Sequence, residues 1–218
     1  MRKMIVIAVY LSSCMGSVLS QERVAATQEQ QTMIEAKISS AAKKMNSMIC
    51  DFEQVKISSL LITNAVSRGK MFYRTSTANT TSLRWEYADG YTFIYNNDHI
   101  QLLSAEGKTL NSVKMTRFFR EIMNTMLMAV NGNGVADKNK FTATFYMDKN
   151  HWYVVLTPVQ RELKNMFSVI ELVFNANDCT GERVEITEKS EDKTIITLIN
   201  KKLNVKIDDN KFLINNVK

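Results

Sequence analysis

The sequence is poor in the residues that build nucleotide and metal sites. Its 218 residues include only 7 Gly and 2 His. There is no G-x-x-x-x-G-K-[ST] motif, and the G-x-G at 132–134 lacks a third glycine. His99 and His151 do not have helical H-x-x-x-H spacing, and the three cysteines form no C-x-x-C pair. We therefore expect no bound nucleotide, metal or other cofactor.

A single proline and few glycines also exclude several classes of chain. Collagen-like and proline-rich scaffolds need many more of both residues, and disordered chains contain far less apolar sequence than the 45% present here. A chain of this length buries roughly 70% of its unfolded surface without help from metals or disulfides. The composition therefore predicts a globular protein with a large apolar core.

The first twenty residues have the pattern of a secretory signal peptide. A basic start, Met1-Arg2-Lys3, precedes an apolar stretch and then small residues up to Ser20. Val18 and Ser20 occupy the −3 and −1 positions for cleavage before Gln21. The apolar stretch of about 16 residues is shorter than the roughly 20 that span a bilayer. We predict export, with residues 1–20 as signal peptide and 21–218 as a single domain.

The same region allows a second interpretation. Leu11-Ser12-Ser13-Cys14 resembles a lipobox, which would make Cys14 an acylated N-terminus. The residues after Cys14 stay apolar up to Leu19, whereas a lipoprotein usually turns polar directly after its cysteine. Export without lipidation is therefore favoured, and anchoring at Cys14 stays open.

Export changes the meaning of the charge and the cysteine count. Loss of Arg2 and Lys3 lowers the formal net charge from +6 to +4, and the remaining charges are interspersed. No nucleic-acid partner is expected from such a distribution. Two cysteines remain, Cys50 and Cys179, and an oxidising compartment permits a disulfide between them. Nothing in the sequence shows whether they lie close together.

Two segments have helical periodicity. Over residues 28–49 and 116–130, apolar side chains recur every three or four positions and polar residues fill the opposite face. We predict two amphipathic helices that cover apolar surface elsewhere in the protein. The first stripe contains Ile34, Ile38, Ala41, Met45 and Met48, and the second contains Phe119, Ile122, Met123, Met126, Leu127 and Val130.

The remainder consists of short apolar segments separated by polar turns, which is typical of antiparallel sheets. Such a large sheet must curl, and curling creates a concave face. The fold class predicted is α+β and mainly β, with helices over the sheet. The twelve predicted strands are 51–57, 69–74, 83–87, 91–96, 99–104, 141–147, 152–157, 167–174, 183–188, 194–199, 203–207 and 211–214.

Several segments resemble one known family when they are taken in order. The run Asp51-Phe52-Glu53-Gln54 is similar to its F-x-Q strand, and Gly69 to Arg74 is similar to its G-x-hydrophobic-aromatic strand. Leu83 to Tyr87 resembles its R-W-x-Y strand, and Val155 to Pro158 resembles its L-T-P strand end. A strand at 169–174 and a terminal one at 212–214 complete the order. The family is the periplasmic outer-membrane lipoprotein carriers (Lol-type, LolA-like) of Gram-negative bacteria.

The resemblance implies an incomplete, strongly curved antiparallel β-barrel with a helical lid over an apolar cavity. In that family, the cavity shelters the acyl chains of lipoproteins during transfer from the inner to the outer membrane. The expected partners are acylated lipoproteins, an inner-membrane release complex and an outer-membrane acceptor, with the protein itself a periplasmic monomer. Such a carrier catalyses no reaction, so no catalytic residues are assigned.

The alternation of side chains supplies a set of candidate cavity residues. Large aromatic and methionine side chains share one face of several predicted strands, and a wide apolar stripe marks the second helix. Ordinary core packing accounts for any one of these positions equally well. The candidates are Met71, Tyr73, Trp85, Tyr87, Phe93, Phe119, Met123, Met126, Leu127, Phe145 and Met147.

An arginine that contacts the lid is a further feature that the resemblance implies. The family usually has R-P after its G-x-aromatic strand, whereas here Arg74 is followed by Thr75-Ser76 and a longer loop. Arg74 is the first candidate for the lid contact and Arg84 is the alternative. Either could be a plain surface arginine.

Three other functions compete with the carrier. A receptor or structural lipoprotein anchored through Cys14 would use the same fold, and so would a module that senses a single lipid. An exported enzyme is the weakest interpretation, because there is no G-x-S-x-G motif and both histidines follow polar turn residues.

The identity of the mature N-terminus distinguishes the diffusible carrier from the receptor anchored through Cys14. We expect mass spectrometry of the protein purified from its exporting host to find an unmodified chain that begins at Gln21. A chain that begins at an acylated Cys14 would contradict the free carrier and support the anchored receptor.

Overall fold

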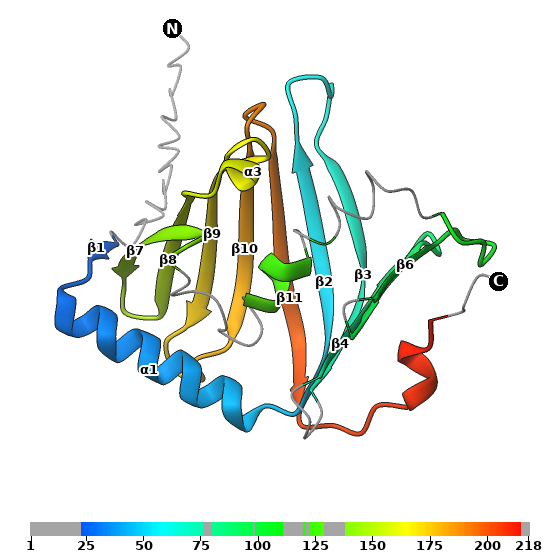
Figure 1. The fold of residues 1–218 in the computed structure, drawn as a ribbon, viewed down its shortest axis with the longest axis horizontal. Helices are drawn as coiled ribbons and strands as arrows, with labels where there is room; N and C mark the ends of the chain where they lie inside the picture. The colour runs from blue at the N-terminus through cyan, green and yellow to red at the C-terminus, as the bar shows by residue number, and fades with distance from the viewer. Residues whose placement is uncertain are drawn as a thin grey trace, which may run out of the picture.

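The computed structural model describes residues 23–75, 80–97, 99–110, 120, 123–128 and 138–214. In this part of the chain, eleven strands form one antiparallel sheet, and no helix is long and apolar enough to cross a membrane (Figure 1). The strands are β1 (Val24–Ala25), β2 (Ser47–Ile57), β3 (Ala65–Thr75), β4 (Thr81–Tyr87), β5 (Thr92–Asn96), β6 (His99–Leu103), β7 (Phe141–Met147), β8 (His151–Pro158), β9 (Phe167–Asn175), β10 (Gly181–Glu188) and β11 (Lys193–Leu203). The helices are α1 (Gln28–Lys44), α3 (Arg161–Lys164) and the 3-10 helix η1 (Asp209–Phe212), with residues 123–128 also helical.

Two meanders of neighbouring strands make up the sheet. Its order is β1-β7-β8-β9-β10-β11-β2-β3-β4-β5-β6, so β2–β6 form one half and β7–β11 the other. The halves join where β11 pairs with β2, from Lys193 opposite Ile57 to Leu203 opposite Met48. The two-residue strand β1 adds to the outer edge beside β7, as Val24 pairs with Met147. This edge strand was not among the predicted strands, because two residues carry too little pattern to be recognised.

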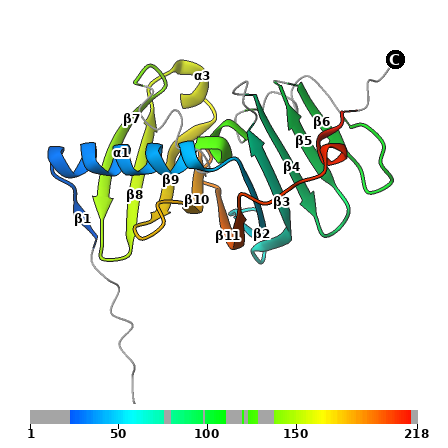
Figure 2. The same cartoon turned by 90° about the horizontal axis from the view of Figure 1, so that it is seen from below.

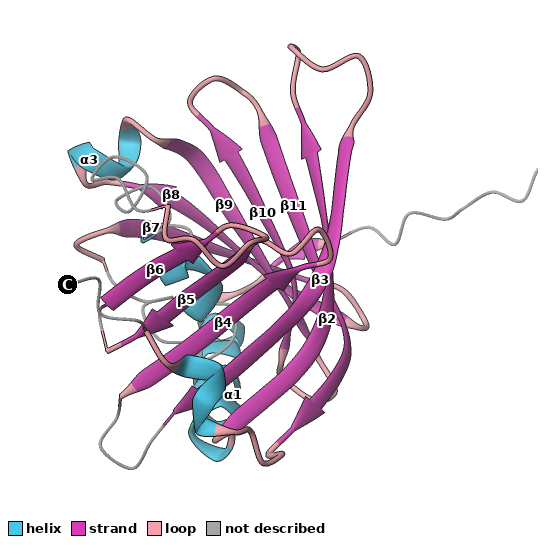
Figure 3. Ribbon diagram, turned by 90° about the vertical axis from the view of Figure 1, so that its right-hand side faces the viewer, coloured by secondary structure: helices cyan, strands magenta, loops and turns pink. Residues whose placement is uncertain are grey.

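The sheet curls around one apolar core. Inward side chains from β2–β11 form a continuous cluster with the buried face of α1 and with the helical residues 123–128. α1 crosses the β7–β11 half, and the short helical segment lies inside the curve (Figures 2 and 3). The two sheet edges, β1 and β6, do not pair with each other. The prediction of an incomplete, curved antiparallel barrel with helical cover is therefore confirmed.

α1 begins as the sequence predicts and ends earlier. Thr27 and Gln30 form a capping box, in which each side chain accepts a hydrogen bond from the other residue's backbone N–H. Ile34 and Ile38 face the core. The prediction that the helix continues to residue 49 was wrong, since it ends at Lys44 and β2 begins at Ser47.

Met48 explains this error. Its spacing fits the helical stripe, but Met48, Cys50 and Phe52 also occupy every second position of β2, and all three side chains are buried on the same face of that strand. Tertiary contacts favour the strand. The Asn204 side chain accepts a hydrogen bond from the backbone of Asn46 at 2.8 Å, and the Ser47 hydroxyl donates to the Val205 carbonyl at 2.6 Å.

The C-terminal segment also departs from the sequence prediction. The predicted strands 203–207 and 211–214 were wrong, because residues 205–208 have no regular structure and 209–212 form η1. The segment runs along the outer face of β3–β5 (Figure 2), where Phe212 and Ile207 pack on Phe72 in a second apolar cluster. Burial against that face produces the alternation that resembles a strand.

This C-terminal contact should contribute measurably to stability. Phe212 is fully buried, and the Arg74 guanidinium lies 4.7 Å from its ring centre. We expect Phe212→Ala to lower the free energy of unfolding by about 3 kcal/mol, measured by urea denaturation. Leu213→Ala is the matched control, since that neighbouring side chain is exposed and should change stability little. Equal effects of the two substitutions would show that the segment does not pack on the sheet in solution.

Candidate functional site

Most of the candidate residues lie on the concave face of the sheet. Met71, Tyr73, Trp85, Phe93 and Phe145 are buried there by strand alternation. Tyr87 and Met147 are half-buried and pack against the same cluster. Met123, Met126 and Leu127 reach it from the helical segment 123–128. Phe119 lies outside the described residues.

Three aromatic rings form the floor of one end of this face. The ring centre of Phe52 lies 4.1 Å from that of Trp85 and 5.3 Å from that of Tyr87, the latter in an edge-to-face arrangement. Gly69 pairs with both Phe52 and Tyr87 across the neighbouring strands. A Cβ at Gly69 would lie 2.7 Å from the Phe52 ring and 1.9 Å from the Glu86 carbonyl oxygen. Because Gly69 has no side chain, the Phe52 ring fits beside it and packs against Trp85.

A cavity of about 280 Å³ lies between this floor and the helical segment. Five of the candidate residues line it: Trp85, Tyr87, Phe93, Met123 and Met126. The other described candidates belong to the core cluster around it. The remaining lining residues were not predicted, and they are Gln54, Lys56, Glu188, Thr194 and Ile196.

The sequence contains a signal for some of these unpredicted residues. Gln54 is the last residue of the F-x-Q run, and Ile196 lies two residues after Thr194 on β11, so that both face the same side of the strand. Lys56 and Glu188 carry no such signal, because charged residues at strand ends are usually solvated. They meet at the cavity because β11 pairs with β2, which carries Lys56, on one side and with β10, which carries Glu188, on the other.

A polar rim surrounds the mouth of the cavity, where β2 and β10 end and β11 begins. Lys56 forms an ion pair with Glu188 and lies 3.8 Å from Asp192, with all three side chains partly exposed. The Tyr87 hydroxyl donates to the Gln54 side-chain oxygen at 3.0 Å. Burial raises the pKa of the Tyr87 hydroxyl to about 12, so it stays neutral and acts as a hydrogen-bonding group. The site therefore combines an apolar interior with an uncharged polar wall and a charged mouth.

The indole N–H of Trp85 is the one unsatisfied polar group of the cavity wall among the described residues. Trp85 is 4% exposed, and this N–H has no hydrogen-bond partner there. The indole lies close enough to the Tyr87 hydroxyl to oppose the rise of that group's pKa, but without the geometry of a hydrogen bond. A buried donor without a partner costs roughly 1–3 kcal/mol, and this nitrogen is itself buried in the wall and not exposed to the cavity.

The two arginines predicted to contact a lid have partners on the opposite face of the sheet. Arg74 forms an ion pair with Asp209 in η1. Arg84 donates to Glu86 at 2.5 Å and to the Lys211 carbonyl at 3.2 Å. Burial raises the pKa of Glu86, but hydrogen bonds from Lys211 and Arg84 outweigh it and lower that pKa overall. The described contacts of these arginines thus hold the C-terminal segment, and their contact with a lid stays a prediction.

Neither of the two described cysteines is in a disulfide. Cys50 is buried in the core, where burial raises the pKa of its thiol to about 12, and Cys179 is partly exposed in the β9–β10 turn. The described residues contain no group of three or more His, Cys, Asp or Glu side chains that could hold a metal ion.

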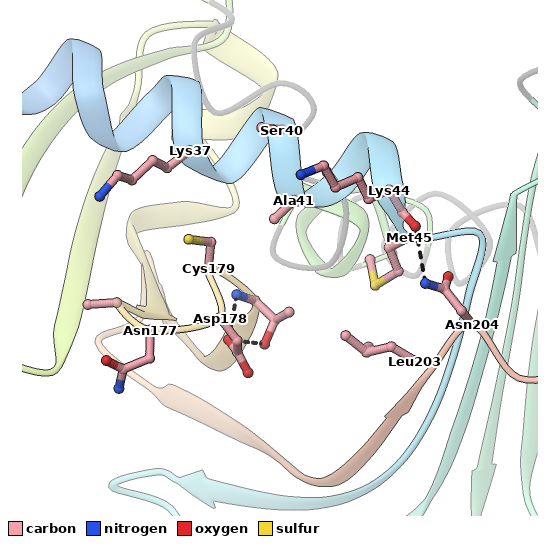
Figure 4. Close-up of a pocket in the computed structure, with 13 residues that line it drawn as sticks. Lys37, Ser40, Ala41, Lys44, Met45, Asn177, Asp178, Cys179, Leu203 and Asn204 are labelled. Carbon is pink, nitrogen blue, oxygen red and sulfur yellow. Dashed lines mark hydrogen bonds between the residues drawn. The ribbon is translucent and has the colours of Figure 1, made fainter.

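A second, larger pocket lies under the C-terminal half of α1 (Figure 4). Its volume is about 480 Å³, and it is bounded by α1, the β9–β10 turn and the end of β11. Polar and apolar groups share its wall about equally, and the polar ones include the charged side chains of Lys37 and Lys44. The polar groups of its turn are already bonded, since Asp178 accepts from the backbone and the hydroxyl of Thr180. The smaller cavity is the better candidate for an apolar ligand because its interior is aromatic and methionine-rich.

Comparison with known proteins identifies the family. Residues 43–215 match the family described as "Outer membrane lipoprotein carrier protein LolA". The chain belongs to the LolA family. The resemblance seen in the ordered strand motifs is thereby confirmed. No curated protein sequence matches the chain significantly.

The comparison with solved structures finds matches at very low sequence identity. A chain of the Pseudomonas aeruginosa MucA/MucB complex is 8% identical with a TM-score of 0.51, and the match covers 84% of this chain. It covers only 60% of that longer chain. The Mycobacterium tuberculosis lipoprotein LppX is 14% identical with a TM-score of 0.43, covering 81% of this chain and 98% of LppX. A LolA superfamily protein from Nitrosomonas europaea is 10% identical with a TM-score of 0.41, covering 87% and 98%.

The aromatic floor of this LolA-family chain should depend on Gly69. We expect Gly69→Ala to lower the free energy of unfolding by about 1–3 kcal/mol, because the added methyl group displaces the Phe52 ring or the β4 backbone. Urea denaturation measures the change. Ser67→Ala, on the same strand, is the control and should have a small effect. If both variants are equally stable, close packing at Gly69 does not limit the floor.

Proposed function

We propose that this chain is an exported carrier that shelters the acyl chains of lipoproteins in the cavity under Met123 and Met126. It would accept them from an inner-membrane release complex and pass them to an acceptor at the outer membrane. Membership of the LolA family supports the ligand class, and the signal-peptide pattern of residues 1–20 supports a periplasmic location.

The observation that carries the proposal is the composition of the cavity wall. Aromatic rings from β4 and β5 form one side, and Met123 and Met126 form the other. Burial of an acyl chain contributes about 0.8 kcal/mol per CH₂ group, without any directional contact. Methionine side chains suit this task because they are flexible and adapt to ligands of different shape.

The size of the cavity sets what it holds without rearrangement. At about 280 Å³ it lies just below the roughly 300–1,000 Å³ typical of ligand pockets. It would therefore accept a single acyl chain or part of one. Several chains would require Met123 and Met126 to move away from the aromatic floor, which costs only their packing contacts.

The lipobox at Leu11–Cys14 favours one alternative. If Cys14 is acylated, the same cavity would belong to a membrane-anchored receptor or lipid-sensing module instead of a diffusible carrier. Both functions use the same ligand site and differ in the state of the N-terminus.

Filling the cavity should weaken ligand binding without unfolding the protein. Thr194 lines the cavity, whereas Thr197 on the same strand faces away from the core. We expect Thr194→Trp to weaken binding of a fluorescent fatty-acyl probe by about tenfold or more, because the added indole replaces the chain. Thr197→Trp, which adds the same group on the opposite face, should bind as the unmodified protein does. Fluorescence titration measures both affinities.

Two results would contradict the proposal. One is that the unmodified protein fails to bind the acyl probe. The other is that Thr194→Trp and Thr197→Trp bind it equally well, which would place the acyl chain outside this cavity. Capture of an acylated lipoprotein, but not of its unacylated form, by the unmodified protein tests the same point with the proposed cargo.

A further inference from the structure

The β2–β3 hairpin exposes apolar side chains at its tip. Ile62 is 104% exposed and Leu60 is 90% exposed, which exceeds every other large apolar side chain that the structure describes. Leu61 between them is 44% exposed. We call these three residues the apolar tip. Scattered single apolar side chains are normal on a protein surface, but a group of them at one place marks a site of contact with another protein or a membrane.

The tip has a defined conformation. The backbone N–H of Leu61 donates to the Ser58 carbonyl at 3.1 Å, and that of Leu60 donates to the Ser58 hydroxyl at 3.3 Å. Below it, β2 and β3 stay paired up to Lys56 opposite Ala65. The paired stem holds the tip beyond the end of the sheet, where it projects from the molecule (Figures 1 and 3).

The tip stands next to the mouth of the candidate cavity. Lys56 lines the cavity and also pairs with Thr194, a second lining residue. Leu60 follows Lys56 by only four residues in the chain. The β10–β11 turn and α3 lie at the same end of the molecule (Figure 1). A ligand that passes the Lys56–Glu188 rim therefore enters or leaves beside the apolar tip.

We propose that the apolar tip inserts into the surface of a lipid bilayer and places the cavity mouth against the membrane that gives or receives the acyl chain. The inference rests on the proposed function, whose ligand must cross between protein and lipid. It adds a membrane-contact site and names the residues that form it.

The shape and charge of the hairpin favour a bilayer over a protein partner. Residues 57–65 contain no charged side chain. A narrow, convex tip of three successive apolar residues offers a protein few directional contacts that would set a register. A bilayer needs no such complementarity, because its interfacial region accepts apolar side chains of any arrangement.

Vesicle flotation tests the proposal with the whole protein. Vesicles of phosphatidylcholine alone measure apolar insertion, and vesicles that also contain phosphatidylglycerol show any contribution from anionic headgroups. We expect the unmodified protein to float with both. The double variant Leu60→Glu/Ile62→Glu should bind about tenfold or more weakly, since two apolar groups are replaced by charges.

A matched control adds the same charge elsewhere. Val24 and Leu213 are each 59% exposed and lie away from the hairpin. The variant Val24→Glu/Leu213→Glu should float as the unmodified protein does. In addition, vesicles of brominated phosphatidylcholine should quench the tryptophan fluorescence of the Ile62→Trp variant more strongly than that of the unmodified protein.

Each unfavourable result has a separate meaning. Equal flotation of the tip variant and the unmodified protein, or no flotation of either, would overturn the proposal. Loss of binding to a purified partner protein with unchanged flotation would also overturn it and assign the tip to protein recognition. The tip variant should bind the soluble acyl probe normally, so failure of the proposed function appears in the probe titration and failure of this inference appears in the flotation.

Discussion

The pairing of β2 with β11 is the contact on which the rest of the molecule depends. It joins two meanders whose internal pairings are between strands adjacent in sequence. Without it, each half would have an apolar face and no opposite wall. With it, the strand that carries Phe52 and Gln54 lies beside the strand that carries Ile196, and a continuous surface curls around one core. Pairing over so long a sequence separation is costly in chain entropy and slows folding.

The wall of the cavity is built from parts of unequal rigidity. The rings of Phe52, Trp85 and Tyr87 are fixed by strands on either side and by the space over Gly69. Met123 and Met126 come from a short helical segment whose apolar side chains pack into the core cluster. A fixed floor preserves the shape of the site, and an adaptable roof lets ligands of different bulk enter. This division suits a protein whose ligand must be released as well as bound.

Much of the sheet could be predicted because its signal is local. Alternation along 83–87 and 91–96 marks the buried face within one strand and identified three lining residues, Trp85, Tyr87 and Phe93, while helical spacing identified Met123 and Met126. The end of α1 could not be predicted, since Met48 satisfies helical and strand periodicity equally well. Apolar and polar residues alternate around Val205 and Ile207 because one side of this segment packs against the outer face of the sheet, although the segment is not a strand. Lys56 and Glu188 meet only through the pairing of distant strands, which no short stretch of sequence encodes.

The C-terminal segment on the outer face has a consequence for the interior. It runs across β3–β5 and is held there by side-chain contacts. The Asn96 side-chain amide donates to the Phe212 carbonyl at 3.0 Å, and the Lys211 ammonium lies 4.5 Å from the Phe72 ring centre. The curvature of these strands sets how far Trp85 and Phe93 stand from the helical roof. Changes on the exterior can therefore widen or narrow the interior without altering any residue that touches a ligand. Substitutions on the outer face of the sheet can thus change the selectivity of the cavity for ligands of different thickness.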